Sequence, residues 1–183
     1  MIMESQGLCE RFDKALISLL DMNGILRDDL NALLDAFPDQ RSQVLRRNFV
    51  RASWAYVEAI THAFKLMVSM LVSEGACKLE PKEAAFLERP RTATLTNIEQ
   101  TIKLVAKVFS VPECNIGNGA DWRHVGPSMK IRNRLVHPKS MESLHVTDSE
   151  WDTHRDGFVW LVEAFDGLLT DISGNGEQRN RGS

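Results

Sequence analysis

The sequence predicts an all-α protein, built as an antiparallel helical bundle of four to five main helices. Apolar residues recur at spacings of three and four along most of the chain, which is the period of a helix that buries one face. No segment shows the sustained alternation of apolar and polar residues that is typical of a strand. The chain has 183 residues, a length that suits one domain whose core folds without metals or disulfides.

The first helical segment covers residues 1–38. Its apolar residues repeat at helical spacing both before and after Asn23-Gly24, a dipeptide that is typical of turns. This segment is therefore expected to be either one bent helix or two helices. Pro38 ends it, because proline interrupts the hydrogen bonds of a helix.

The next stretch, from about Asp39 to Ser73, predicts the longest helix. Gly75 follows it and suits the left-handed conformation of a C-terminal cap. Glu58 lies among apolar neighbours in the second half of this helix. From this position alone, we expect an ordinary carboxylate on the helix surface. Four arginines gather in the first half of the helix: Arg41, Arg46, Arg47 and Arg51.

The middle of the chain predicts a connection, a helix and a loop. Residues 79–91 contain two prolines and indicate a connection with one short helical turn. A helix from about Thr94 to Phe109 follows, with an apolar stripe on one side. Residues 111–120 predict a loop whose Asn115-Ile-Gly-Asn-Gly is turn chemistry, because a phosphate loop would end in Lys-Ser/Thr and follow a strand.

Two helices are expected in the last third of the chain. Pro127 suits the first turn of one, and this helix must end near His137, because Pro138 disfavours helical geometry in the residue before it. Thr147 and Glu150 form a capping-box pattern that opens the last helix.

These elements predict three parts in the domain organisation. Residues 1–38 would form an N-terminal helical segment packed on the bundle, and residues 39–173 the bundle itself. The polar, glycine-rich residues 174–183 predict a flexible tail.

Charge and composition narrow the classes of function. The net charge of -3 and the isoelectric point near 6.0 argue against a protein that coats nucleic acid through a broad basic surface. The three cysteines are odd in number and far apart, as expected in a reducing compartment. The most apolar stretch, residues 64–72, is too short to span a bilayer, and no secretory signal is recognisable. A cytoplasmic protein without a membrane segment is predicted, and no cofactor or metal is expected, since the histidines and cysteines lack ligand spacing.

The segment from Pro127 to Pro138 carries the residues suited to chemistry. On a helix, Ile131 and Leu135 share a face that can reach the core, whereas Asn133 and His137 stack on another face. An arginine can bind a phosphate through two hydrogen bonds, and a histidine can move protons near neutral pH. An asparagine can orient the histidine ring or a phosphate oxygen. Together these residues suit metal-free cleavage of RNA, in which the 2′-hydroxyl of the RNA is the nucleophile. The same residues would equally serve to cap the end of a helix.

Arg132-Asn133, three residues, His137 and then Pro138 resemble the motif of the HEPN superfamily. That motif is an arginine, often followed by a polar residue such as asparagine, with a histidine four to six residues after the arginine. As in that superfamily, the motif lies at the end of a helix that precedes the last long helix. The resemblance in fold covers roughly residues 40–172.

The resemblance implies a helical bundle that pairs about a two-fold axis and cleaves RNA without metal, in toxin–antitoxin, phage-defence or RNA-processing systems. It implies that Arg132 and His137 are catalytic and that Asn133 supports them. An acidic or polar residue on an earlier helix often completes such sites, and Glu58 is the candidate here. The expected substrate-binding residues are Lys130, Arg134, Lys139 and Glu58.

One departure and two alternatives accompany this prediction. One toxin branch of the superfamily has a tyrosine that a partner enzyme modifies two residues after the histidine, but Lys139 stands there in this chain. A similar motif occurs in mannitol-repressor-type regulators, so a non-catalytic regulatory or protein-interaction module, partnered by an antitoxin or regulatory protein, is the main alternative. A DNA-binding repressor that uses the basic face from Arg47 to Arg51 is a third.

Overall fold

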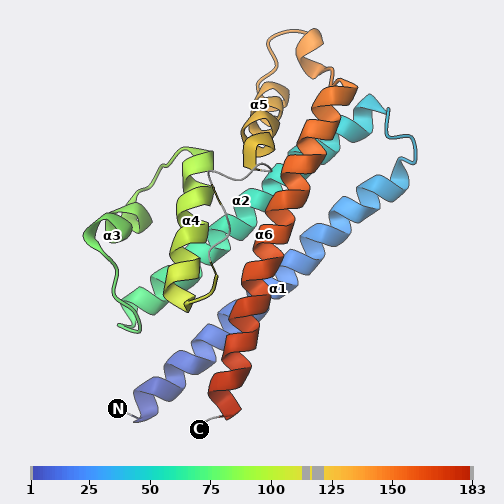
Figure 1. Ribbon diagram of the computed structural model, residues 1–183. Coiled ribbons are helices and arrows are strands. Elements are labelled where there is room, and N and C mark those ends of the chain that lie inside the picture. Colours follow the sequence, from blue (N-terminus) through green and yellow to red (C-terminus); the bar gives the residue numbers. More distant parts are fainter. Residues whose placement is uncertain (1, 113–115, 117–121, 182–183) are drawn as a thin grey trace. The chain divides into compact units, whose positions relative to one another are not determined.

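The computed structural model describes residues 2–112, 116 and 122–181, and within them it contains six α-helices and no strand (Figure 1). The predicted all-α class is therefore confirmed, and the helices form a helical bundle. The helices are α1 (Ile2–Ala36), α2 (Gln43–Ser73), α3 (Pro81–Glu88), α4 (Thr94–Phe109), α5 (Val125–Val136) and α6 (Asp148–Arg181). Two short 3-10 helices cover Trp122–His124 and Glu142–Leu144.

The chain divides into two compact units. Unit 1 comprises residues 1–23, 59–114 and 167–183, and unit 2 comprises residues 24–58 and 115–166. Helices α3 and α4 belong to unit 1 and α5 to unit 2, whereas α1, α2 and α6 contribute one part to each unit. The predicted division at residues 38 and 173 remains a prediction, and α6 continues as a helix to Arg181.

Unit 1 packs the second half of α2 against α3 and α4. The apolar stripe of α4 is buried, as are Phe64 and Val68 of α2 and Phe86 of α3. The rings of Phe12 and Phe109 lie 5.6 Å apart and connect α1 to this core. Burial of one stripe per helix is the main source of stability for such an arrangement.

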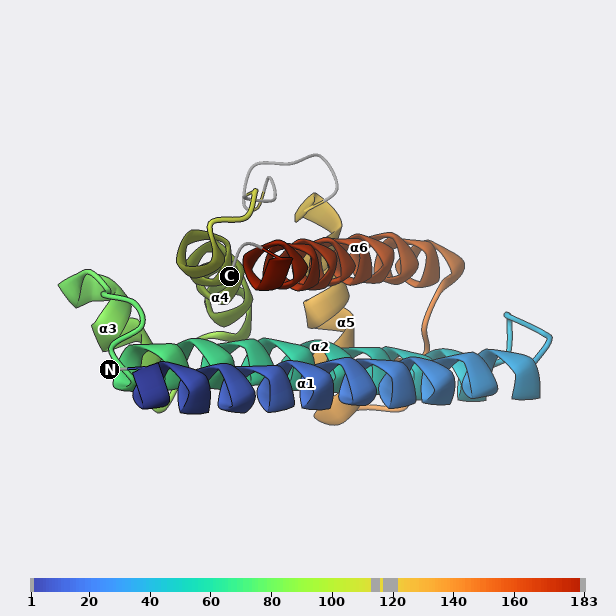
Figure 2. The ribbon, with the colours of Figure 1, turned by 90° about the horizontal axis from the view of Figure 1, so that it is seen from below.

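Unit 2 has a core rich in aromatic side chains. Trp54 and Tyr56 of α2 are buried, and Phe49 makes edge contacts with Trp151 and Phe158 of α6. Helix α5 crosses α2 and the first part of α6 within this unit (Figure 2). This placement puts the motif helix directly over the aromatic core.

Most predicted helix ends are found where the cap residues indicated. Gly75 adopts a positive φ of 71°, and its N–H bonds to the carbonyl of Val72 while that of Ala76 bonds to Leu71, which is a Schellman cap. Thr147 and Glu150 exchange backbone and side-chain hydrogen bonds of 3.0 and 3.2 Å, which confirms the capping box.

The alternative left open at Asn23-Gly24 is decided, and one predicted boundary is wrong. Helix α1 continues through Asn23-Gly24, so the one-helix alternative holds and the two-helix alternative does not, since a glycine inside a helix costs only about 1 kcal/mol. Helix α2 begins at Gln43 instead of Asp39, because the Asp39 carboxylate accepts the N–H of Arg41 at 2.9 Å and holds a turn there. The predicted loop at residues 111–120 lies largely outside the described residues.

Among the described residues, α2 is the one helix long and apolar enough to cross a membrane by length and composition, and 39% of its most apolar window is buried. The core helix of a soluble protein has the same properties. A cytoplasmic location therefore remains a prediction.

Candidate functional site

The candidate site is built on α5, which follows a 3-10 turn and carries Pro127 in its first turn. The helix ends at Val136, and His137 leaves helical geometry with φ −123° and ψ 63° while its N–H still bonds to the carbonyl of Asn133 at 3.0 Å. Pro138 explains this ending, because it disfavours helical geometry in His137. The predicted end of the motif helix is thereby confirmed.

Three buried or half-buried contacts fix the orientation of α5. Ile131 and Leu135 are buried, as their shared face predicts. Arg51 of α2 donates from Nη2 to the carbonyl of Leu135 at 2.8 Å, so a cation satisfies the C-terminal end of the helix and complements its dipole. These contacts determine the directions in which the other side chains of α5 point.

Arg132 and Glu58 form an ion pair between α5 and α2, with Nη2 and Oε1 2.8 Å apart. Nη1 of the same guanidinium donates to Oδ1 of Asn133 at 3.1 Å. The Arg132 and Glu58 side chains retain 25% and 41% of their exposure. Such partly exposed pairs contribute little to stability. The acidic residue chosen by sequence reasoning thus lies beside the motif arginine.

Lys130 and Arg134 occupy a different face of α5, toward α6. Both line a cavity of about 300 Å³ together with Glu150. Arg134 makes an ion pair of 2.8 Å with Glu150 and also donates to the carbonyl of His145 at 2.8 Å. Burial by itself would raise the pKa of the Glu150 carboxyl, but hydrogen bonds from Arg134 and Thr147 hold the pKa below its ordinary value.

His137 and Lys139 are exposed beyond the end of the helix. Within the described residues, neither side chain makes a hydrogen bond or ion pair. The seven predicted site residues are therefore divided within one chain: Glu58, Arg132 and Asn133 lie together, Lys130 and Arg134 face α6, and His137 and Lys139 are free of partners among the described residues.

A buried polar chain beneath α5 was missed by sequence reasoning. His154 bonds through Nε2 to Ser53 Oγ at 2.9 Å and through Nδ1 to Ser128 Oγ at 2.8 Å, and Trp54 donates to Ser128 Oγ at 3.1 Å. This chain connects α2, α5 and α6. Burial lowers the pKa of His154 to about 3, so the imidazole is neutral at physiological pH.

The available sequence signal was the position of His154 on the apolar stripe of α6, three residues after Trp151 and four before Phe158. That spacing indicates burial, but the serine partners come from segments 101 and 26 residues away. Among the described residues, no three His, Cys, Asp or Glu side chains are grouped as metal ligands.

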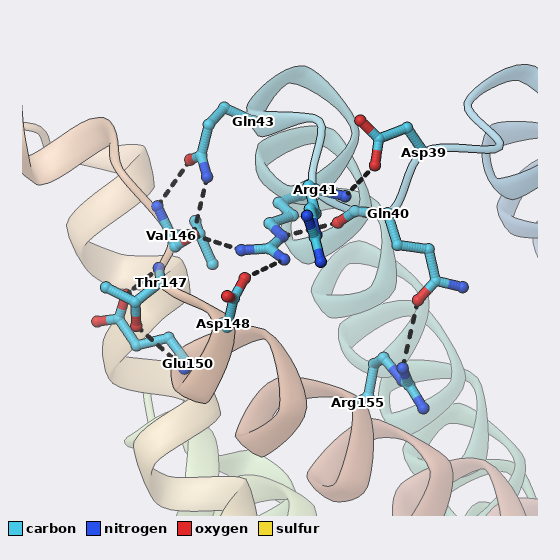
Figure 3. Close-up of polar contacts among 10 residues, drawn as sticks. Asp39, Gln40, Arg41, Gln43, Val146, Thr147, Asp148, Glu150 and Arg155 are labelled. Atoms are coloured by element: carbon cyan, nitrogen blue, oxygen red, sulfur yellow. Dashed lines mark hydrogen bonds and ion pairs between the residues drawn. The ribbon is translucent and has the colours of Figure 1, made fainter.

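The arginines at the start of α2 serve the fold of unit 2. Arg46 is buried and donates to the carbonyls of Gln40 and Val146 and to the Asp148 carboxylate, at 2.8, 2.9 and 2.6 Å (Figure 3). The Gln43 side chain makes two further hydrogen bonds to the backbone of Val146: its Nε2 donates to the carbonyl, and its Oε1 accepts the N–H. These contacts join the turn before α2 to the turn before α6.

The neighbouring arginines of α2 are also engaged with backbone. Arg47 donates to the carbonyl of Leu144 at 3.3 Å, and Arg51 caps α5 as described above. The side chains of the basic face proposed for a DNA-binding repressor are thus bonded within the chain.

No protein-family model, curated protein or solved structure matches this chain. The resemblance to the HEPN superfamily therefore rests on the motif of α5 and on its place in the helix order.

Proposed function

We propose that this chain is a HEPN-like, metal-independent endoribonuclease that acts as a homodimer in the cytoplasm, of the toxin or phage-defence type. The observation that carries the proposal is the ion pair of 2.8 Å between Arg132 and Glu58. It holds the motif arginine at the surface, beside a carboxylate from an earlier helix, while the motif histidine stays exposed at the end of the same helix.

In this mechanism, Arg132 exchanges Glu58 for the scissile phosphate and stabilises the charge that develops on it. His137 moves a proton, either from the 2′-hydroxyl or to the leaving 5′-oxygen. Asn133, already bonded to Arg132 at 3.1 Å, orients the guanidinium. Proton transfer and charge stabilisation suffice for this reaction, because the nucleophile belongs to the RNA itself.

A dimer would supply what one chain does not bring together. Within one chain, spacing on α5 separates the Arg132 and His137 side chains, and no hydrogen bond connects them among the described residues. Two copies related by a two-fold axis would offer a pair of each to one RNA. Lys130, Arg134 and Lys139 would then bind flanking phosphates.

Cleavage of a mixed RNA pool in excess EDTA tests this proposal. The wild type should cleave, whereas His137→Ala and Arg132→Ala should each lose at least about a hundredfold in rate. Size-exclusion chromatography with light scattering should show that these variants keep the oligomeric state of the wild type.

His145→Ala is the matched control, because His145 is also exposed and lies beyond the motif. It should cleave at the wild-type rate. Equal cleavage by His137→Ala and the wild type would remove His137 from the mechanism and with it the proposed site.

A non-catalytic regulatory or protein-interaction module of the same architecture is the second candidate. The observation that favours it is the ion pair of 2.8 Å between Arg134 and Glu150 of the same chain, as expected of a residue that stabilises the fold. A lack of cleavage by wild-type dimers, together with capture of an antitoxin or regulatory protein that Arg132→Ala fails to capture, would support this candidate.

A further inference from the structure

Unit 1 contains a polar cavity of about 660 Å³ beside the start of α4. Its walls come from the second half of α2, the end of α3, the connection that follows and the first turn of α4. The basic side chains of the lining are His62, Lys65, Arg89 and Arg91, and the acidic one is Glu88. Three permanent cations thus face one carboxylate, in a protein whose net charge is -3.

Lys65 is held in place on this wall. Its Nζ donates to Oδ1 of Asn97 at 3.2 Å and lies 4.3 Å from the centre of the Phe86 ring. Burial lowers the pKa of this amine, as expected where water is partly excluded and no carboxylate compensates. A bound anion would restore the missing counter-charge.

Arg89 and Arg91 have no side-chain hydrogen bond or ion pair with any residue that the structure describes. Five other arginines, in contrast, each reach a carboxylate: Arg11, Arg27, Arg46, Arg132 and Arg134. A pair of guanidinium groups on one cavity wall without counter-ions is suited to an anion with several oxygens.

One further polar group of the cavity lining lacks a partner. The Oγ1 atom of Thr92 is buried without a hydrogen bond among the described residues, although such groups are normally satisfied. The N-cap position of α4 is Ala93, which provides no side-chain acceptor for the first amides of the helix. A ligand oxygen at this place would satisfy the hydroxyl and would meet the positive end of the helix dipole.

We propose that this cavity binds a small molecule that carries a phosphate monoester or diphosphate. Arg89 and Arg91 would bind the phosphate oxygens, Lys65 would neutralise the remaining charge, and the apolar Leu66 and Leu87 of the lining would contact the rest of the molecule. A volume of about 660 Å³ lies within the range of small-molecule sites. None of these residues belongs to the proposed cleavage site, so this inference stands or falls independently of it.

Isothermal titration calorimetry with pyrophosphate at low ionic strength tests the proposal. The wild type should bind, and the double variant Arg89→Gln/Arg91→Gln should bind at least about tenfold more weakly. Lys14→Gln/Lys78→Gln is the matched control, because it removes the same charge from exposed residues of unit 1 that do not line the cavity. It should bind within about twofold of the wild type, since it leaves the cavity unchanged.

Glu88→Gln should change the affinity for pyrophosphate in the opposite direction. Removing the carboxylate of the lining should tighten pyrophosphate binding several-fold, a gain that damage to the fold cannot produce. Circular dichroism should show the same helical content in all variants. Unaltered affinity in the Arg89→Gln/Arg91→Gln variant, or weaker binding in Glu88→Gln, would overturn the assignment.

Further ligands distinguish the sources of phosphate. Glycerol 3-phosphate should compete with pyrophosphate, and glycerol should not. Competition by an RNA oligonucleotide with a 5′-hydroxyl end, at concentrations where glycerol 3-phosphate fails to compete, would overturn the small-molecule assignment. Absence of pyrophosphate binding to the wild type would also overturn the proposal.

Discussion

At the scale of single residues, His154 shows how a titratable group can act as a core residue. Both ring nitrogens are hydrogen-bonded, to Ser53 and Ser128, and Trp54 completes the chain. A self-consistent arrangement has Nε2–H donating to Ser53, whose hydroxyl donates to the carbonyl of Val50, while Nδ1 accepts from Ser128. The neutral ring is thus satisfied, whereas the protonated ring would be a buried charge without a counter-ion in this chain of bonds.

The stability of the protein should therefore fall when the pH is lowered below neutrality. The pKa of His154 is about 3 in the folded protein and about 6.5 when exposed. Because the unfolded chain binds the proton more readily, the contribution of His154 is complete above pH 6.5 and is lost as the pH falls toward 3. Between these limits the expected loss is about 1.4 kcal/mol for each pH unit.

Urea unfolding at pH 7, 6 and 5 measures this dependence. His154→Gln should be less stable at pH 7 but should show a flatter dependence on pH, smaller by about one proton. Carboxyl groups with lowered pKa, such as Glu83, lose their contribution only at lower pH and do not mask the effect. An identical slope in both proteins would contradict a neutral, buried His154.

Arg46 stabilises the fold mainly through the backbone carbonyls to which it donates hydrogen bonds. Its side chain is 5% exposed while that of its ion-pair partner Asp148 is 82% exposed, so the bonds to the carbonyls of Gln40 and Val146 should matter more than the ion pair. Arg46→Met should lower the free energy of unfolding by about 2–3 kcal/mol, whereas Asp148→Asn should have a clearly smaller effect. Chemical denaturation of both variants at pH 7 checks this order, and a larger loss in Asp148→Asn would reverse the assignment.

At the scale of helices, α6 comes close to the backbone at the beginning of α5 at Gly157. A Cβ atom placed there would lie 2.9 Å from the carbonyl carbon of His124 and 3.1 Å from the N atom of Val125. These are backbone atoms, which cannot rotate away. The absence of a side chain at this position therefore sets how closely the two helices pack.

Gly157→Ala should destabilise the protein by about 1–2 kcal/mol, because the strain of overpacking exceeds the gain of about 1 kcal/mol in helix propensity. Gly24→Ala is the matched change in a helix where nothing lies within 4 Å of the added Cβ, and it should stabilise by about 0.5–1 kcal/mol. Denaturant midpoints of the two variants should thus move in opposite directions, and a stabilised Gly157→Ala would disprove the close contact.

The helices differ in how far the sequence could predict them. The range Thr94–Phe109 was predicted to the residue, because a clear apolar stripe and flanking breaks agree there. At Asn23-Gly24 the sequence left one bent helix and two helices open, and α1 continues there because a glycine inside a helix costs only about 1 kcal/mol. Local spacing likewise predicted which residues share a face of α5.

Spacing could not identify tertiary partners, however. The bond between Arg132 and Glu58 spans 74 residues, and Glu58 was selected by residue type alone. The polar cavity of unit 1 was not predicted from the sequence either, because residues 89 and 91 lie in a connection without periodicity. The sequence alone does not predict such a charge cluster, because its residues come from several elements that are brought together only in the folded protein.

At the scale of the whole molecule, the balance of charges limits how RNA can bind. The net charge is -3, and several basic residues of unit 2 are committed to partners within the unit, including Arg46, Arg47 and Arg51. The affinity for RNA that the proposed function requires would then come from a few cations near the motif. Lys139 is the clearest of these, since it is exposed and has no partner among the described residues.

The salt dependence of RNA binding should therefore be modest and should respond to single charges. In a His137→Ala background, which leaves the RNA intact, the logarithm of the association constant should fall linearly with the logarithm of salt concentration. Adding Lys139→Gln should reduce the magnitude of this slope by about 0.7 for each copy that contacts the strand. Fluorescence anisotropy with a labelled oligonucleotide measures both slopes.

The Arg89→Gln/Arg91→Gln change is the control and should leave the slope unchanged, because the cavity that these arginines line is assigned to a small phosphorylated ligand. If the slope instead responds to these arginines and ignores Lys139, then RNA binds through unit 1, and the motif of α5 is not the main contact with the strand.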